Sequence, residues 1–246
     1  MIPIVILIGD DELADGPDVA ATVYRSFSDE APTKSAAPSL RDYLDAVESG
    51  DFDEALILTP AAEFTVMYRN ARLAATMSRR HVVVVDTRTA AAGQGLITSV
   101  AAEALKSGAS AEEAAELAQR AALRTELVAM LPDLTSIERS GHVPATALGT
   151  TAAQRAQPLF RFSAGSIDPL SGAGPDTDAS LALRVTWEAS GGPGAERTLF
   201  FHAAHLAEAQ RFRQLLGRND PIVEFSPAMT VHTGIGCVGV AWMRAG

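Results

Sequence analysis

The sequence predicts an α/β protein of two domains, and three observations point to that class. Residues 82–85 are four valines in a row, which pack well on a pleated sheet and poorly on a helix. The run has no polar alternation, so both faces of the strand should be covered, as in a parallel sheet. Before residue 130, strands alternate with segments of helical spacing. After about residue 135, shorter strands are separated by polar and glycine-rich loops.

The N-terminal half is predicted to be a parallel sheet with crossover helices. Ser39 and Ser110 are the expected N-caps, because a serine hydroxyl accepts a hydrogen bond from a free amide of the first helical turn. In chain order the pattern predicts a first sheet strand over 1–9, helices over 18–27 and 40–49, a strand over 55–58, a helix over 63–77, the strand at 82–85, helices over about 89–105 and 111–124, and a short strand over 125–130.

The C-terminal half is predicted to hold shorter strands and one longer helix. Residues 181–189 place apolar side chains at every second position, which predicts a half-exposed strand. Further strands are expected over 159–162, 198–201, 222–225 and 238–243, with a helix over 206–216. We place a domain boundary near residue 135, so the expected domains are 1–135 and 136–246.

Composition excludes several classes of function. The net charge of −10 and the pI of about 4.9 argue against a nucleic-acid-binding protein, which needs a basic surface. The only cysteine, Cys237, excludes an intrachain disulfide and a cysteine metal cluster, and we expect it to be a small buried residue. Residues 1–9 are too short and lack the basic leader of a signal peptide. No apolar stretch is long enough to span a membrane, so we expect a cytoplasmic protein without stable membrane insertion.

Two glycine-containing segments are candidates for ligand contact. Asp86, Thr87 and Arg88 follow the valine strand, at the sheet edge where ligands of open α/β sheets bind. Near the end of the chain, GIGCVG (234–239) matches a dinucleotide fingerprint, but no helix follows it. We expect instead a loop whose glycine amides point together as an oxyanion nest, with His232 and Thr233 as polar tips. The other four histidines are expected to be hydrogen-bonded or exposed rather than metal ligands.

Four segments together resemble the DegV family of bacterial lipid-binding proteins. They are VVDTRTAAAGQGL, RTELVAMLPDLTSIERSGHV, FFHAAHLAEAQRF and HTGIGCVGVAW, in the order and spacing of the family's motifs. The resemblance implies two α/β domains, the second with a mixed sheet. It also implies one long-chain fatty acid in a buried tunnel, with its carboxylate toward the interdomain cleft. Some members present that carboxylate to a separate fatty acid kinase subunit. A non-catalytic carrier or presenting subunit, with no metal and no cofactor besides the bound acid, is therefore expected.

The resemblance also implies site residues. SAAPS (35–39) matches the family's carboxylate loop, so Ser35 takes the place of a hydroxyl donor. In the second loop, residues 61–68, Thr65 and Tyr68 keep the family's character. The terminal histidine loop is matched by His232, Thr233 and Gly234, and the position of a phosphate or partner contact by Arg139. Possible tunnel residues are Phe64, Met67, Phe160, Phe162 and Met229.

Several departures from the family pattern leave alternatives open. Two family serines are Ala61 and Ala62, Glu63 replaces a glycine, and His142 replaces an arginine. A carboxylate facing Glu63 would be repelled unless that side chain turns away. One alternative is a divergent paralogue with an altered or lost lipid site that acts through a protein partner. Another is a small acyl or phosphoryl transferase with His232 as base, although the sequence reveals no nucleophile–base pair.

Overall fold

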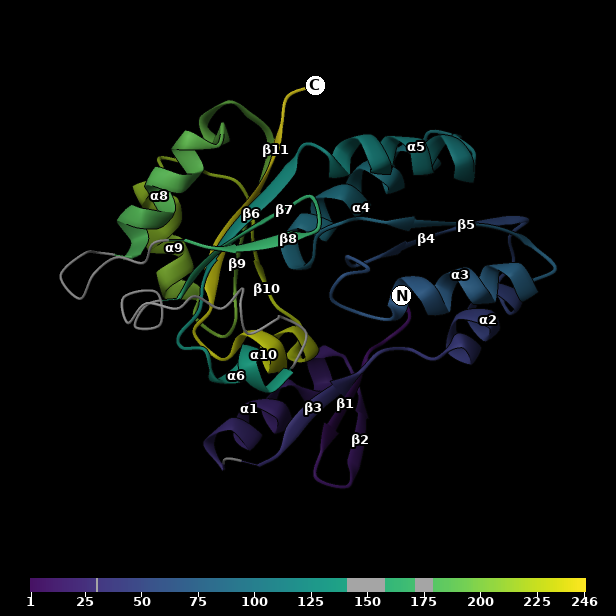
Figure 1. The fold of residues 1–246 in the computed structure, drawn as a ribbon, viewed down its shortest axis with the longest axis horizontal. Coiled ribbons are helices and arrows are strands. Elements are labelled where there is room, and N and C mark those ends of the chain that lie inside the picture. The colour runs from purple at the N-terminus through teal and green to yellow at the C-terminus, as the bar shows by residue number, and fades with distance from the viewer. Residues whose placement is uncertain (30, 141–157, 171–178) are drawn as a thin grey trace.

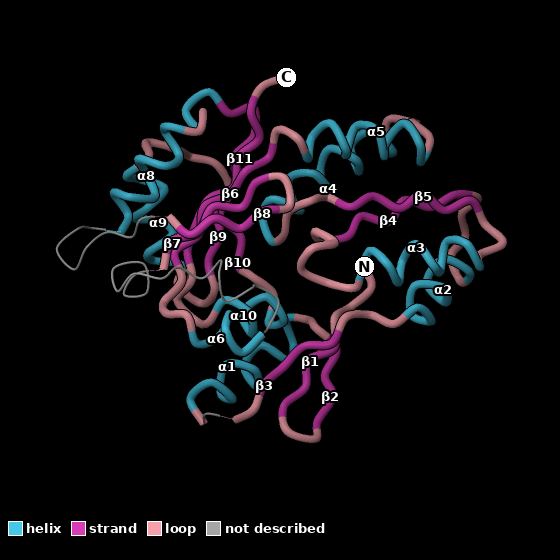
Figure 2. The backbone as a smooth tube through the Cα atoms, in the orientation of Figure 1, coloured by secondary structure: helices cyan, strands magenta, loops and turns pink. Residues whose placement is uncertain are grey.

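The structure is a computed structural model that describes all residues except 30, 141–157 and 171–178. Its described strands form three sheets, ordered β2-β1-β3, β4-β5 and β10-β9-β11-β6-β7-β8 (Figures 1 and 2). Helices cover these sheets, so the α/β class predicted from the sequence is confirmed. No described helix has both the length and the apolar character needed to cross a membrane.

The N-terminal strand does not join the parallel sheet. β1 (Val5–Ile8) pairs antiparallel with β2 (Asp11–Ala14) and with β3 (Thr33–Ala36). The prediction that residues 1–9 begin the parallel sheet is therefore wrong. The reason is local: Gly9, at φ +60°, opens a two-residue turn that folds the acidic segment back onto β1. The chain returns to β3 through the short helix η1 (Pro17–Val19) and α1 (Ala20–Ser28).

The predicted parallel strands pair in register and are covered on both faces. β4 (Glu54–Thr59) runs parallel to β5 (His81–Asp86), with Glu54 opposite His81 and Thr59 opposite Asp86. Helices α2 (Leu40–Glu48) and α3 (Met67–Met77) lie on one side, and α4 (Ala91–Lys106) and α5 (Ala111–Ala122) on the other (Figure 1). Ser39 and Ser110 cap α2 and α5 as predicted, each in a reciprocal capping box with the acidic residue three positions on.

The larger sheet is mixed, as expected. At its centre β11 (Val238–Arg244) lies between β9 (Ala195–His202) and β6 (Thr125–Met130), antiparallel to both. β7 (Leu159–Ser163) and β8 (Ser166–Pro169) extend it as a hairpin beside β6, and β10 (Ile222–Glu224) runs parallel to β9. Gly239 is required in β11, because a Cβ atom there would lie 2.2 Å from the carbonyl oxygen of Val128.

Residues predicted as a half-exposed strand form a helix instead. In α8 (Ala179–Ala189), Leu183 and Trp187 are buried, whereas Leu181 and Val185 are 47% and 57% exposed. The buried positions are four residues apart, which is the spacing of one helical face. Apolar residues at every second position fit one face of a strand. Within the same run, Leu183 and Trp187 are four residues apart and so also fit one face of a helix. Packing against the large sheet selects the helix.

The division into domains stays a prediction. β6 precedes residue 135, yet it lies inside the six-stranded sheet of the C-terminal half. α4 also packs against β6, β9 and β11, while α5 packs against β4 and β5. The helix pair α4–α5 thus connects the small parallel sheet to the large one. The remaining described elements are α6 (Thr135–Ser140), η3 (Gly192–Gly194), α9 (Leu206–Leu215) and α10 (Pro227–Thr233).

Candidate functional site

Helix α10 carries the candidate histidine. Ser226 caps its start, since the serine hydroxyl accepts a hydrogen bond from the amide of Met229 at 3.5 Å, and Pro227 takes the first helical position. The helix ends at Gly234, whose φ is +78°. His232 and Thr233 therefore lie in the last helical turn, and the prediction that they are tips of a loop is wrong. The Ser-Pro start and the glycine stop are the local signals for this helix.

The structure brings Ser35 and His232 into hydrogen-bond contact. Ser35 Oγ lies 2.8 Å from His232 Nε2, although 197 residues separate them in sequence. Ser35 lies opposite Ile6 in the β1–β3 pair, and directly opposed residues share one face of a sheet. On that face Ile6 and Val23 pack against Ala228 and Val231 of α10 in one buried cluster. Apolar burial between the small sheet and α10 thus positions the polar pair.

The loop that follows Ser35 reaches the start of α3. Asn70 Nδ2 donates a hydrogen bond to the carbonyl oxygen of Pro38 at 2.9 Å. Thr65 lies two residues before α3, and its hydroxyl accepts a hydrogen bond from the Met67 amide at 3.3 Å. That bond delays the start of α3 to Met67, four residues later than predicted. The segment 35–39 therefore connects α10 at one end with α3 and the Thr65 turn at the other.

The glycine-rich loop after α10 does not form the predicted oxyanion nest. The Gly234 amide donates to the Thr230 carbonyl and the Gly236 amide to the Ala203 carbonyl, each at 2.8 Å. The Thr233 hydroxyl donates to the Met229 carbonyl at 3.1 Å. These three donors are used within the fold, so the nest prediction is wrong. Gly234 is needed for close packing, since a Cβ atom there would approach Pro132 Cγ to 3.0 Å.

At its carboxyl edge, the β4–β5 sheet contacts the β7–β8 hairpin of the six-stranded sheet. Thr87 donates from its amide and its hydroxyl to the Thr59 carbonyl, at 3.1 Å and 2.8 Å. Arg88 donates from Nη2 to the Ala164 carbonyl at 2.6 Å, and its own carbonyl accepts from the Gly165 amide at 2.7 Å. Glu63 Oε1 lies 3.8 Å from the Arg88 guanidinium. The carboxylate that could repel a ligand thus faces Arg88 and the β7–β8 turn.

Two titratable side chains, Cys237 and His202, are buried in the core. Burial raises the pKa of the Cys237 thiol to about 12, so it stays protonated at neutral pH. The prediction of a small buried cysteine is therefore confirmed. His202 is 5% exposed, and desolvation by burial lowers its pKa. Its Nδ1 accepts a hydrogen bond from the His205 amide at 3.2 Å, which confirms the prediction of a hydrogen-bonded histidine.

Most of the predicted tail-contacting residues face one apolar cluster. Phe64 and Phe162 meet edge to face with ring centroids 5.9 Å apart. Both are partly buried and, together with Met229, pack against the main core, which also contains Phe160. Met67 instead packs beside Tyr43, in the cluster between α2 and α3.

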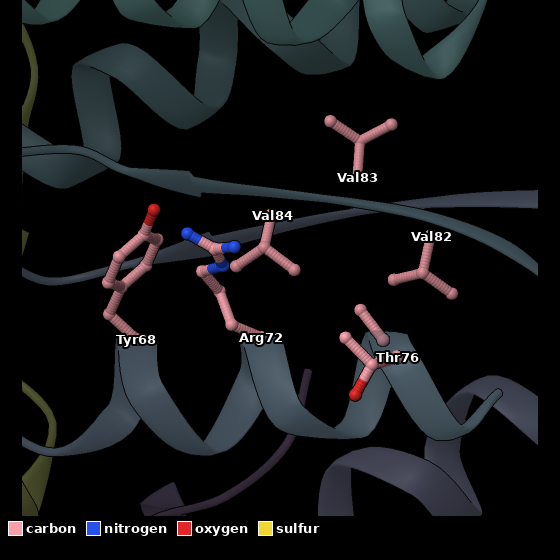
Figure 3. A pocket seen from close by; sticks show the side chains of 7 residues that line it. Tyr68, Arg72, Thr76, Val82, Val83 and Val84 are labelled. Atoms are coloured by element: carbon pink, nitrogen blue, oxygen red, sulfur yellow. The ribbon is translucent and has the colours of Figure 1, made fainter.

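A groove of about 380 Å³ lies between α3 and β5. Tyr68, Arg72 and Thr76 project from successive turns of α3 toward β5, where Val82 and Val84 face the helix and the Val83 side chain points away from it (Figure 3). Ser35, Thr65 and His232 are not among its lining residues. The groove therefore takes in Tyr68 of the second loop without reaching the polar pair.

Arg139 is exposed on α6, which packs against α10 (Figure 1). The predicted departure at His142 lies outside the described residues. A basic side chain is thus carried by the helix next to the one that bears His232. Its contact with a phosphate or a partner stays a prediction.

Comparison with known proteins gives a consistent result over the whole chain. The family model described as uncharacterised protein, DegV family, matches residues 1–245. A DegV domain-containing protein of Streptomyces coelicolor is 26% identical over 97% of this chain and 89% of its own length. One of Mycobacterium tuberculosis is 25% identical over 97% of this chain and 88% of its own length.

Solved structures share the fold at low sequence identity. DegV of Bacillus subtilis, a fatty acid binding protein, is 17% identical with a TM-score of 0.86, over 100% of this chain and 91% of its own. A DegV lipid-binding protein of Thermotoga maritima is 22% identical with a TM-score of 0.83, over 98% of this chain and 89% of its own. A DegV family protein of Eubacterium eligens loaded with heptadecanoic acid is 18% identical with a TM-score of 0.83, over 99% and 92%. The match of the family model over nearly the full length shows that the chain belongs to the DegV family.

Proposed function

We propose that the chain binds one long-chain fatty acid, with the carboxylate at Ser35 and His232. The observation that carries the proposal is the 2.8 Å contact between Ser35 Oγ and His232 Nε2. Each of these atoms can donate a hydrogen bond, and each does so most strongly to an ionised acceptor. A carboxylate that replaces their mutual bond accepts from both.

Thr65 supplies a third donor in this proposal. Its oxygen already accepts from the Met67 amide, which leaves the hydroxyl proton for an acceptor. The Asn70–Pro38 bond holds the Thr65 turn against the segment that begins at Ser35. Glu63 does not oppose the ligand, because its carboxylate faces Arg88.

The alkyl chain would lie along Met229 toward Phe64 and Phe162. Met229 precedes His232 by three residues on α10, so the two side chains share a helix face. Met229, Phe64 and Phe162 are all partly buried against the same core cluster. Each buried methylene contributes about 0.8 kcal/mol, so a tail of sixteen carbons contributes on the order of 10 kcal/mol. Family membership and the fatty acids bound by DegV proteins such as that of Eubacterium eligens support this class of ligand.

We expect the purified chain to carry one acyl chain, measurable as a single mass increment in native mass spectrometry. Extraction with organic solvent should release a fatty acid, and the delipidated protein should take up palmitate or oleate at one molecule per chain. A denaturing spectrum of the same sample is the control, because a non-covalent ligand is lost there. A ligand-free native spectrum, together with no uptake of either acid, would rule out the proposal.

The proposal includes presentation of the bound carboxylate to a kinase subunit. Arg139 is exposed on the helix beside α10, where a partner acting at His232 would contact it. We expect Arg139→Ala to slow phosphorylation of the bound acid by a fatty acid kinase subunit about tenfold, since one charge-assisted hydrogen bond is lost. Arg120→Ala, an exposed arginine on α5, is the control. An unchanged rate in Arg139→Ala with unchanged acyl content would exclude this contact.

The Ser35–His232 contact also favours a second candidate, a small acyl transferase. A hydroxyl hydrogen-bonded to an imidazole is the usual nucleophile–base arrangement. Against it, the amides of Gly234 and Gly236, the predicted oxyanion donors, are bonded within the fold. Turnover of an acyl phosphate by the wild-type chain alone, abolished in Ser35→Ala, would favour the enzyme over the carrier.

A further inference from the structure

A mixed set of imidazole and carboxylate groups converges at the amino ends of the two parallel strands. Glu54 begins β4, His81 begins β5, and Glu112 lies in the first turn of α5. One potential ligand atom from each lies within 4.8 Å of the other two. The group is at the opposite end of these strands from the Arg88 contact. None of its members belongs to the proposed fatty acid site.

The backbone fixes where these three side chains start. Glu54 and His81 are direct partners in the parallel register and so share one face of the sheet. α5 covers that face and contacts both strands. The capping box of Ser110 with Glu113 sets the first turn of α5, and Glu54 Oε1 accepts a hydrogen bond from the Ala111 amide at 2.9 Å. Each side chain therefore begins on regular secondary structure.

The charges of this group are not balanced by other side chains. His81 Nε2 is paired with Glu112 Oε1. In the part of the chain that the structure describes, no arginine or lysine forms an ion pair with Glu54 or Glu112. Glu54 instead accepts a hydrogen bond from the Ala111 amide, so two carboxylates lie close to one imidazole, and like charges this close repel one another. A divalent cation balances both carboxylates and also uses the imidazole nitrogen.

We propose that Glu54, His81 and Glu112 bind a divalent transition-metal ion of the zinc class. One imidazole nitrogen with two carboxylate oxygens is a donor set that favours zinc over magnesium, which prefers oxygen alone. Ligand atoms about 2 Å from a shared tetrahedral zinc lie about 3.3 Å apart, so the carboxylate of Glu54 has to move closer and the His81 and Glu112 atoms, which are in direct contact, have to separate. His81 and Glu112 have side chains 58% and 51% exposed, which leaves them free to make that movement. Water completes the coordination.

Bound metal would join β4, β5 and the start of α5. An ion that binds the folded chain stabilises it by mass action. We therefore expect thermal unfolding to move to higher temperature with ZnCl₂ and to return after EDTA. The effect should be independent of fatty acid content, because the metal group and the Ser35–His232 pair share no residue.

Calorimetric titration of ZnCl₂ into the full chain, prepared without added histidines and freed of metal by EDTA, tests the site. We expect one zinc per chain, weaker binding of Mn²⁺ and no heat with Mg²⁺. His81→Gln and Glu112→Gln should each weaken zinc binding at least about tenfold. Both residues are exposed, and circular dichroism checks that each variant is folded.

Glu116→Gln is the matched control, since it lies one turn further along α5 and pairs with Arg120. It should leave the affinity for zinc unchanged, as should His205→Gln, which removes an exposed histidine elsewhere. Absence of zinc binding by the wild-type chain would overturn the proposal. Equal affinity in the wild type, His81→Gln and Glu112→Gln would show an adventitious ion only, and would overturn it as well.

Discussion

Replacing His232 by alanine is expected to weaken palmitate binding by about 10- to 100-fold. A hydrogen bond to a charged group contributes about 1.5–3 kcal/mol, and 1.4 kcal/mol corresponds to tenfold in affinity. The alkyl chain keeps its contacts, so binding is reduced rather than abolished. Ser35→Ala should have a similar effect, and the double variant should lose less than the sum, because the two groups contact each other at 2.8 Å. Competition with a fluorescent fatty acid on delipidated protein measures all three.

Two controls separate headgroup binding from loss of fold. His205→Ala removes an exposed histidine, and Ser107→Ala removes a hydroxyl that bonds only within its own helix end. Neither should change palmitate affinity. The methyl ester of palmitate should bind the wild type and His232→Ala with nearly equal affinity, because it lacks the ionised oxygen. Wild-type affinity for palmitate in the Ser35→Ala, His232→Ala double variant would refute the headgroup site.

Trp242→Ala is expected to lower the free energy of unfolding by about 3–5 kcal/mol. Trp242 is fully buried in the central strand β11, where it packs with Leu183, Phe200 and Phe212. Its indole also donates a hydrogen bond to the Ser190 carbonyl at 3.2 Å. Since domains are stable by about 5–15 kcal/mol, this is a large share of the total. Urea unfolding followed by circular dichroism should show a clearly lower midpoint.

A pair of leucines on α8 provides the matched comparison. Leu183→Ala should cost about 2–5 kcal/mol, because Leu183 is fully buried in the same cluster as Trp242. Leu181→Ala, at a 47% exposed position two residues earlier, should change stability by less than about 0.5 kcal/mol. Equal effects of the two substitutions would mean that residues 181 and 183 share one buried face, as residues two apart do in a strand. A loss below about 1 kcal/mol in Trp242→Ala would contradict the central position of β11.

Features set by neighbouring residues could be predicted from the sequence. The caps at Ser39 and Ser110 depend on an acidic residue three positions on, and both form as predicted. The valine strand becomes β5, and the helix after it becomes α4. In each case the residues that predict the element lie within it or next to it in the sequence. Local preference and the final fold agree there, so the prediction succeeds.

Features set by distant contacts could not be predicted in this way. The turn at Gly9 is local, but the packing of β1 against α10, more than 200 residues further along the chain, cannot be read from residues 1–9. The free amides expected at Gly234 and Gly236 are taken up by Thr230 and Ala203, whose positions the glycines themselves do not reveal. Within the sequence, only the family resemblance relates Ser35 to His232. The Glu54, His81 and Glu112 group has no sequence signature, because it exists only once two strands and a helix are aligned.

The burial of Ile6 and Val23 against Ala228 and Val231 has a consequence for synthesis on the ribosome. The β1–β2 hairpin is synthesised more than 200 residues before α10, the helix that covers its apolar face. A nascent chain therefore carries this face uncovered until α10 emerges, and closing so long a loop is a slow event. Fragments that stop short of residue 228 lack both that cover and the histidine, so they cannot assemble the polar pair.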